Sequence, residues 1–277
     1  MYNGKNDSSK AFCKRKVLDM EKNIIFFDID GTLLDDEKRL PASTKEAVFR
    51  LKELGHEVAI ATGRAPFMFK DLRDELGIDT YVCFNGQYVV LQGKPVYTNC
   101  LNKNALEALT ISAGEKNHPL IYMDADDMKM SVPEHNWITE SIGTLKLENG
   151  PTHEPEYFRG RDIYQTLLFC EQDDELAYVE TFKEFDFVRW HPVSVDVLPV
   201  GGSKAKGIEK LIEAMGLRIE NAYAFGDGLN DMEMLKYVPN SVAMGNALPE
   251  VKEAARYETI HVNDGGIMHG LKLVGLL

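Results

Sequence analysis

The sequence predicts an α/β fold, a doubly wound parallel sheet that carries an inserted α+β unit. Three observations lead to this prediction. Short apolar runs alternate with amphipathic helical segments at both ends of the chain, as in parallel strand–helix–strand units. Polar residues follow these runs where each strand should end. Over roughly residues 87–198 the spacing changes to that of an antiparallel sheet with helices.

The first half of the expected core starts with the apolar run 24–27. This run is short, β-branched and aromatic, as a strand buried on both faces should be. The helix that follows has Ser43 as its expected N-cap, with Glu46 as the capping-box partner and Gly55 at its end. The expected elements are strands at 24–27, 58–61 and 81–84 and helices at 43–54 and 66–76.

The middle block, 87–198, is expected to fold as a separate α+β unit. Gln92-Gly93 between two short strand-like runs predicts a hairpin at its start. The segment 143–161 is rich in Gly, Pro and Glu and predicts a loop. The other expected elements are strands at 120–123, 163–169, 185–190 and 193–198 and helices at 103–116 and 173–183.

The first pattern resumes after residue 199. We expect helices at 204–215, 231–235 and 249–255 and strands at 222–225, 242–244 and 259–262. The Rossmann-like core should therefore consist of 23–86 and 199–277. Residues 1–22 are polar and lack the apolar stretch of a signal peptide, so we expect a flexible N-terminal extension.

Composition narrows the possible partners. The formal net charge is -13, which disfavours nucleic acid, since binders of the phosphate backbone carry basic patches. No apolar run approaches the roughly 18–20 residues that span a bilayer, so no membrane partner is expected. The four cysteines form no C-x-x-C pair and favour reduced thiols in a cytoplasmic protein. The oligomeric state stays open.

Two acids directly follow the first expected strand. Asp28 and Asp30 alone would be an ordinary turn, because Asp favours turns. A buried strand that leads into two acids, a glycine and Thr32 is more specific. Phosphoryl transfer can use such a pair: one carboxylate can attack phosphorus, and the other can protonate the leaving group and then deprotonate water. Carboxylates are also preferred ligands of Mg²⁺.

Further polar residues belong to the same expected edge of the sheet. Thr62 follows the second strand, Lys204 opens a helix, and Asp227 and Asp231 flank a Gly-rich turn after a late strand. Taken singly, each has an ordinary explanation as a helix N-cap, a solvated lysine or a turn. Because the carboxyl ends of parallel strands meet at one edge, we expect all of them around one site.

This ordered set resembles the four motifs of the haloacid dehalogenase-like (HAD-like) phosphatases, from Ile24 to the C-terminus. The motifs are Asp28-Ile29-Asp30-Gly31-Thr32-Leu33, Ala61-Thr62-Gly63-Arg64, Ser203-Lys204 and Gly226-Asp227-Gly228-Leu229-Asn230-Asp231. Asn85-Gly86 and the stretch 243–247 resemble features of the Cof-type branch. The large insertion lies between the second and third motifs, which is similar to the C2B cap of subclass IIB and implies a cap that governs substrate specificity.

The resemblance implies a role for each motif residue. Asp28 would be the nucleophile and a magnesium ligand, and Asp30 the acid/base, with its backbone carbonyl on the metal. Thr62 and Lys204 would hold phosphoryl oxygens. The implied metal ligands are Asp28, Asp30 and Asp227; the implied phosphate-binding positions are Ile29, Gly63, Arg64 and Asn230; Asp231 would orient Lys204 or a metal-bound water.

Some assignments stay open at this point. Lys206 competes with Lys204 for the third motif, and Lys204 is preferred because it follows Ser203. Arg64 could meet substrate phosphate or pair with an acid. Several polar residues of the inserted unit could touch substrate, although solvation or packing is the more common role of such residues: Asp124, Asp126, His135, Trp137, Arg161 and His191.

The expected function is that of a magnesium-dependent phosphatase. Its substrates would be small phosphorylated metabolites, sugar phosphates or similar phosphomonoesters, and an aspartyl-phosphate intermediate would form. One alternative is a sugar-phosphate mutase-like phosphotransferase or a dedicated sucrose-phosphate-type phosphatase. Another is a non-catalytic sensor of phosphorylated metabolites.

Overall fold

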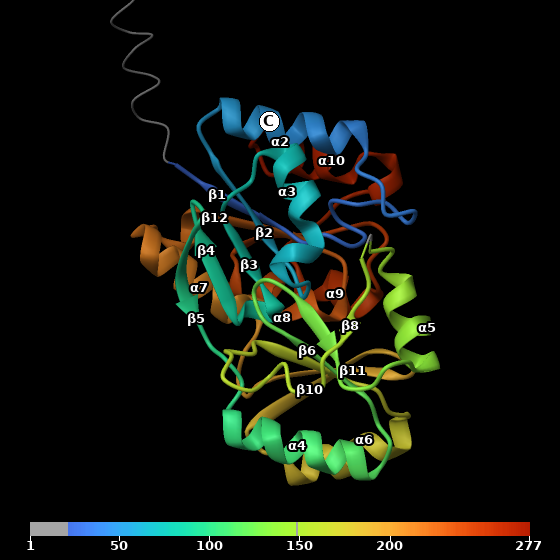
Figure 1. The fold of residues 1–277 in the computed structure, drawn as a ribbon. Helices are drawn as coiled ribbons and strands as arrows, with labels where there is room; N and C mark the ends of the chain where they lie inside the picture. The colour runs from blue at the N-terminus through green and yellow to red at the C-terminus, as the bar shows by residue number, and fades with distance from the viewer. Residues whose placement is uncertain (1–21, 148) are drawn as a thin grey trace, which may run out of the picture.

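The computed structural model describes residues 22–147 and 149–277, so the expected extension at 1–22 lies almost wholly outside the described residues. Within them the chain forms two sheets (Figure 1). The larger, the core sheet, has eight strands in the order β14, β13, β12, β1, β2, β3, β4, β5. Their bounds are Tyr257–Glu258, Asn240–Ala243, Ala222–Gly226, Ile24–Phe27, Glu57–Ala61, Tyr81–Cys83, Tyr88–Leu91 and Lys94–Thr98.

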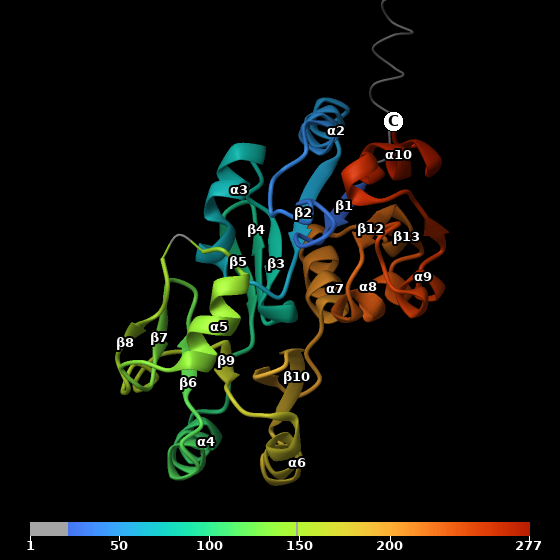
Figure 2. The same ribbon diagram turned by 90° about the vertical axis from the view of Figure 1, so that its right-hand side faces the viewer.

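Helices cover both faces of the core sheet, as predicted for a doubly wound fold (Figure 2). Successive residues of β1 point to opposite faces: Ile25 and Phe27 pack in one apolar cluster, Ile24 and Phe26 in another. The first face is covered by α2 (Ala42–Glu53), α3 (Lys70–Leu76) and α10 (Gly266–Leu273), and the second by α7 (Lys204–Met215) and α8 (Met232–Tyr237), with α9 (Pro249–Ala254) beside α8.

The second sheet, the cap sheet, has six described strands in the order β10, β11, β9, β6, β7, β8. Their bounds are Phe185–His191, Ser194–Pro199, Gln165–Leu168, Leu120–Met123, Met128–Met130 and Thr152–His153. Helices α4 (Lys103–Glu115) and α6 (Gln172–Thr181) pack on the face away from the core. Helix α5 (Asn136–Thr144) packs on the opposite face, which lies toward the core sheet (Figure 2).

The predicted hairpin forms, but it belongs to the core sheet. Strand β4 pairs antiparallel with β3, through Val82 and Val89 among others, and β5 completes the edge. The boundary expected at residue 87 is therefore wrong, and the inserted cap begins beyond Thr98. A hairpin can extend either neighbouring sheet, and its sequence does not state which one.

Several local predictions also differ from the structure. Helix α2 begins at Ala42, with Pro41 at the N-cap and no side-chain cap, so Ser43 lies within its first turn. The fixed φ of proline suits this position. The last strand is at Tyr257–Glu258 rather than 259–262, and helices α5 and α10 were not predicted. No helix of the described ranges is long and apolar enough to cross a membrane.

Candidate active site

The parallel register brings three strand ends to one level. Phe27 of β1 lies opposite Ile60 of β2 and Phe225 of β12. The backbone N–H of Asp28 donates to the carbonyl of Phe225 at 3.0 Å. Residues that follow these strands therefore leave the sheet side by side, and three of the four acids predicted at this edge meet there: Asp28, Asp227 and Asp231.

Three carboxylates gather at this edge. Asp28, Asp227 and Asp231 each place an oxygen within 4.8 Å of the others. The Lys204 ammonium, which is fully buried, donates to Asp28 Oδ1 and to Asp231 Oδ1, both at 2.6 Å. Lys204 is the first residue of α7, whereas Lys206 points to solvent and pairs with Glu209.

Asp231 ties the Gly-rich turn to this cluster. Its second oxygen accepts the backbone N–H groups of Asp227 at 3.0 Å and Gly228 at 2.9 Å. Both carboxylate oxygens of Asp231 are thus engaged, one by Lys204 and one by the turn. The arrangement fixes the turn and Lys204 relative to each other.

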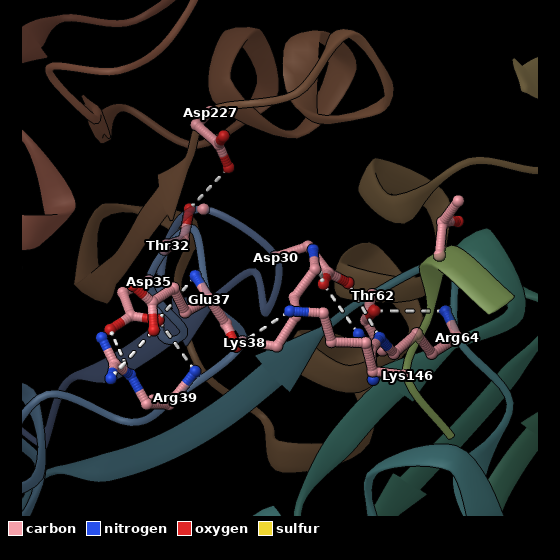
Figure 3. A network of polar contacts seen from close by, with 12 residues as sticks. Asp30, Thr32, Asp35, Glu37, Lys38, Arg39, Thr62, Arg64, Lys146 and Asp227 are labelled. Carbon is pink, nitrogen blue, oxygen red and sulfur yellow. Dashed lines mark hydrogen bonds and ion pairs between the residues drawn. The ribbon is translucent and has the colours of Figure 1, made fainter.

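Asp227 is held from two other sides. Its Oδ1 accepts from the Thr32 hydroxyl at 3.0 Å (Figure 3), and its Oδ2 from the Asn246 amide at 3.0 Å. Gly31 lies directly against it with φ of 82°, and a Cβ at that position would come 2.2 Å from Asp227 Oδ2. The glycine between the first two acids and Thr32 is therefore required both by its backbone conformation and by the close approach of Asp227.

The cluster carries more negative than positive charge. Burial raises the pKa of Asp28 well above its ordinary value; Asp231 and Asp227 act in the same direction, and Lys204 opposes them. Burial and then the charge of Asp231 raise the pKa of Asp227 to about 6. Burial would lower the pKa of Lys204, but Asp231 and Asp28 outweigh it, so the pKa is raised and the ammonium stays charged. Hard oxygen donors with excess negative charge fit a divalent cation such as Mg²⁺.

The Asp30 carboxylate lies apart from the cluster and is paired instead (Figure 3). Arg64 donates to both of its oxygens, at 2.8 and 2.7 Å, and Lys38 donates to Oδ1. Burial alone would raise the pKa of Asp30, but the hydrogen bonds from Arg64 and Lys38 outweigh it and lower the pKa. From the sequence, Arg64 could meet substrate phosphate or pair with an acid. In the structure it pairs with an acid, Asp30.

A cavity of about 300 Å³ lies between the core edge and the cap sheet. Asp28, Asp30 and Thr62 line it, as do three of the expected phosphate-binding positions, Gly63, Arg64 and Asn230. The fourth, Ile29, has a fully buried side chain in the apolar core and does not line the cavity. The cap contributes Met123, Leu145, Gln165, Leu167, Trp190 and Asp196.

Asp196 is a residue of this cavity that the sequence reasoning missed. Its Oδ2 accepts from the Asn85 amide at 3.2 Å, and Asn85 Oδ1 in turn accepts from Asn230 at 3.4 Å. Burial raises the pKa of Asp196 to about 7, although the Asn85 hydrogen bond opposes this. The sequence does contain a signal that could have identified Asp196, namely an acid in the middle of the apolar strand β11.

The cap residues considered from the sequence do not line this cavity. Asp124 accepts from Tyr157 and Arg161, and His135 accepts from the backbone N–H of Trp137 at the start of α5. Their contacts are those of residues that hold the cap together. The six residues are Asp124, Asp126, His135, Trp137, Arg161 and His191.

Residues 25–271 match the model of the haloacid dehalogenase-like hydrolases. The chain belongs to this family. This HAD-like hydrolase is 47% identical over 258 residues to the putative phosphatase YkrA of Bacillus subtilis. The aligned region covers 93% of this chain and all of YkrA. The chain is 31% identical to the pyridoxal phosphate phosphatase YbhA of Escherichia coli, over 85% of this chain and 92% of that protein.

A solved structure agrees with these relatives. The HAD subclass IIB sugar phosphatase BT4131 matches with a TM-score of 0.82 and 29% identity, over 92% of this chain and all of that one. The predicted α/β fold and the resemblance to the Cof-type, subclass IIB phosphatases are confirmed. This HAD-like hydrolase is an enzyme, a phosphatase that acts on phosphoric monoesters.

Proposed function

We propose that this phosphatase requires Mg²⁺ and hydrolyses small phosphorylated metabolites, sugar phosphates or similar monoesters, through a phospho-aspartate on Asp28. The observation that carries the proposal is the position of Asp28. Its carboxylate lines the cavity, is held by Lys204 and lies within reach of Asp227 and Asp231.

Asp28 is the nucleophile in this proposal. Lys204 binds Oδ1, and among the described residues the structure gives Oδ2 no hydrogen bond, which leaves that oxygen for phosphorus. As the Asp28–phosphorus bond forms, the bond from phosphorus to the leaving oxygen breaks. The Thr62 hydroxyl, the Gly63 N–H and the Asn230 amide, all at the cavity wall, hold the phosphoryl oxygens.

Asp28 and Asp227 are the proposed side-chain ligands of the metal, together with the backbone carbonyl of Asp30. Asp231 is a positioning residue, because one of its oxygens is held by the Lys204 ammonium and the other accepts two backbone N–H groups, whereas each oxygen of Asp227 accepts a single hydrogen bond from a neutral group. When bound, Mg²⁺ would offset the negative charge of phosphate and carboxylates that otherwise repel each other.

Asp30 is the proposed acid and base. It donates a proton to the leaving oxygen and later takes one from the water that attacks the phospho-aspartate, releasing phosphate and restoring Asp28. In the structure Arg64 and Lys38 keep Asp30 ionised. An incoming phosphate competes for Arg64, and loss of that partner raises the pKa of Asp30 toward the protonated form that the first step needs.

The relatives support small phosphomonoesters as substrates. YbhA is named for pyridoxal phosphate and BT4131 for sugar phosphates, so related proteins are named for compact esters of different kinds.

We also propose a cytoplasmic location. The described cysteines, Cys83, Cys100 and Cys170, are free thiols, which supports a reducing compartment.

One experiment tests the whole proposal. The purified chain is incubated with a panel of sugar phosphates, pyridoxal phosphate and p-nitrophenyl phosphate, with Mg²⁺ or with excess chelator. We expect free phosphate with Mg²⁺ alone, and an acid-quenched reaction should yield a phosphorylated peptide that contains Asp28. A phosphorylated isomer as the product would favour a mutase, and the absence of any turnover would favour a sensor.

A further inference from the structure

We infer that Asp196, Gln165 and Trp190 form a recognition site for the leaving group of the substrate. The site takes a compact alcohol that carries hydrogen-bond donors, hydroxyl or N–H, on a body with an apolar face. The inference rests on the proposed function, since it concerns the far end of the same cavity. We call these three residues the cap triplet.

The strand register places the cap triplet on one face of the cap sheet. Asp196 of β11 lies opposite Leu167 of β9, and Gln165 is two residues before Leu167. The side chains of Asp196, Leu167 and Gln165 therefore share a face. On the other side of β11, Val188 of β10 lies opposite Asp196, the register shifts between Arg189 and His191, and Trp190 at this shift lines the cavity. This face of the cap sheet lies over Asp28. The evidence is that Gln165, Trp190 and Asp196 line the same cavity as Asp28.

The cap triplet has hydrogen-bonding capacity that the protein does not use. Within the described ranges, Gln165 Oε1 and Trp190 Nε1 are buried without a partner, and Gln165 is only 3% exposed. Asp196 is 8% exposed, and its Oδ1 has no described partner. Buried polar atoms are almost always paired, so two buried unpaired atoms on one cavity wall, beside an Asp196 oxygen with no partner among the described residues, indicate a ligand that completes them.

The atoms left free define the ligand. Gln165 Oε1 is an acceptor and calls for a donor, and the Trp190 indole N–H calls for an acceptor, whereas Asp196 Oδ1 accepts when the carboxyl is ionised and donates when it is protonated. Hydroxyl groups on a ring satisfy both kinds, and so do ring N–H and hydroxyl groups together. Carboxylate-rich leaving groups are disfavoured, because they would meet the field of a chain with a net charge of -13.

The rest of the wall limits size and shape. Met68 and Ala65 from the core and Met123, Leu145 and Leu167 from the cap supply apolar surface. A cavity of about 300 Å³ is at the lower end of the range for ligand sites, roughly 300–1,000 Å³. A phosphate and one ring-sized group are therefore the expected content, with a face of that ring packed on the apolar wall.

Asn85 connects the cap triplet to the phosphate end. This residue is buried, and its amide donates to Asp196 while its carbonyl accepts from Asn230. Asn85 also lies against Gly63, where a Cβ would come 3.0 Å from Asn85 Oδ1. The position of Asp196 is thus set relative to the two residues proposed to hold phosphate, which favours leaving groups with a defined distance between phosphorus and donor.

Matched pairs of esters test the inference. One pair is a hexose 6-phosphate with cyclohexylmethyl phosphate, and the other is pyridoxal 5′-phosphate with benzyl phosphate; p-nitrophenyl phosphate serves as a general probe. We expect the wild-type chain to favour the donor-bearing member of at least one pair by about 100-fold or more in kcat/KM, because a site built to bind a donor rejects the analogue without it.

Variants then assign that preference. Trp190→Phe removes the indole N–H, and Asp196→Asn and Gln165→Met change the acceptors; each should reduce the preference ratio about tenfold or more. Trp137→Phe and Asp173→Asn, cap residues outside the cavity, should leave it unchanged. Thermal unfolding checks that each variant folds. If one of the three variants does not fold, the other two still test the inference.

The outcomes separate this inference from the proposed function. Turnover of p-nitrophenyl phosphate with no preference within either pair, or with a preference that all three variants retain, would overturn the cap triplet alone. Absence of turnover with every ester in the presence of Mg²⁺ would overturn the proposed function, and the inference with it.

Discussion

Lys204 illustrates how the site is held together at the scale of single residues. Its ammonium is fully buried and touches Asp28 and Asp231, which are buried as well. Removing one partner of a buried ion pair typically costs about 3–5 kcal/mol, because the other charge stays behind without compensation. Loss of Lys204 should therefore destabilise the fold as well as disturb the position of the proposed nucleophile.

The first prediction concerns Asp28→Asn. The amide keeps the size of the side chain but cannot attack phosphorus, so kcat for p-nitrophenyl phosphate should fall by at least about 1,000-fold. Circular dichroism should show an intact fold, and Asp173→Asn is the control on the cap surface. Substantial turnover by the folded variant would remove Asp28 from its proposed role.

A second prediction follows from the raised pKa of Asp196, about 7 in the folded protein against about 3.9 in an unfolded chain. Between these values the folded state keeps a proton that the unfolded state has lost, so wild-type stability falls as the pH rises through this window. Asp196→Asn lacks that proton. The difference in free energy of unfolding between Asp196→Asn and the wild type should therefore shift by about 2–3 kcal/mol in favour of the variant as the pH rises from 5 to 8.

Urea unfolding at several pH values measures this difference. Asp173→Asn, a change at an exposed acid, should run parallel to the wild type over the same range. If the Asp196→Asn and wild-type curves also stay parallel, Asp196 does not hold a proton in the folded protein at neutral pH.

Single residues also mark what the sequence could predict of the site. The acids at the ends of β1 and β12, Thr62 and Lys204 were all expected at one edge, because parallel strands bring their ends together. Lys38 and Asp196 were not expected there. Their contacts depend on the course of a loop and on the docking of the cap, neither of which leaves a periodic trace in the sequence.

At the scale of elements, the first turn of α7 decides which of two lysines enters the site. Ser203 caps this helix by accepting from the Lys206 N–H, and Lys204 points inward while Lys206 points to solvent. Residues two apart on a helix do not share a face, so only one of the two lysines can reach Asp28.

The third prediction compares these lysines. Lys204→Met should lower kcat by about 100-fold or more and also lower the melting temperature, because it leaves Asp28 and Asp231 without their cation. Lys206→Met loses only an exposed pair with Glu209, which is worth little, and should stay within twofold of the wild type. Steady-state kinetics and thermal unfolding of both variants check this, and equal effects would contradict the assignment.

The elements themselves were predicted unevenly. Strands buried on both faces, such as β1, were recovered because continuous apolar runs bounded by polar residues are distinctive. Helix α5 was missed because its sequence sits at the edge of a segment rich in Gly and Glu. Strand β14 has only two residues and pairs through β13, so the tertiary contact rather than its own sequence defines it.

At the scale of the whole molecule, an acidic chain has to bind an anionic substrate. With a net charge of -13 the overall field opposes phosphate; Lys204 and Arg64 supply local positive charge, and in the proposed function a metal ion adds to it. A cation bound at the core edge should therefore matter both for activity and for the stability of the folded state.

The fourth prediction tests this dependence. Excess chelator should abolish turnover, and added Mg²⁺ should restore it. Because the metal binds the folded state, Mg²⁺ at about 100 times its dissociation constant should stabilise the chain by about 2.7 kcal/mol, a rise of several degrees in melting temperature. Asp227→Asn should reduce that rise. Full activity after exhaustive chelation would contradict the metal's role.

The position of β1 between β2 and β12 has a consequence for synthesis of the chain. Ile24 lies opposite Glu57, which follows early in the chain, but its other partner, Ala222, leaves the ribosome only after the entire cap. Until then one edge of the nascent sheet is unpaired, a state prone to wrong association. A cap that folds first shortens the effective loop between the two halves and lowers the entropy cost of closing them. Early folding of the insertion would thus favour the pairing of β1 with β12, quite apart from what the cap does in the finished enzyme.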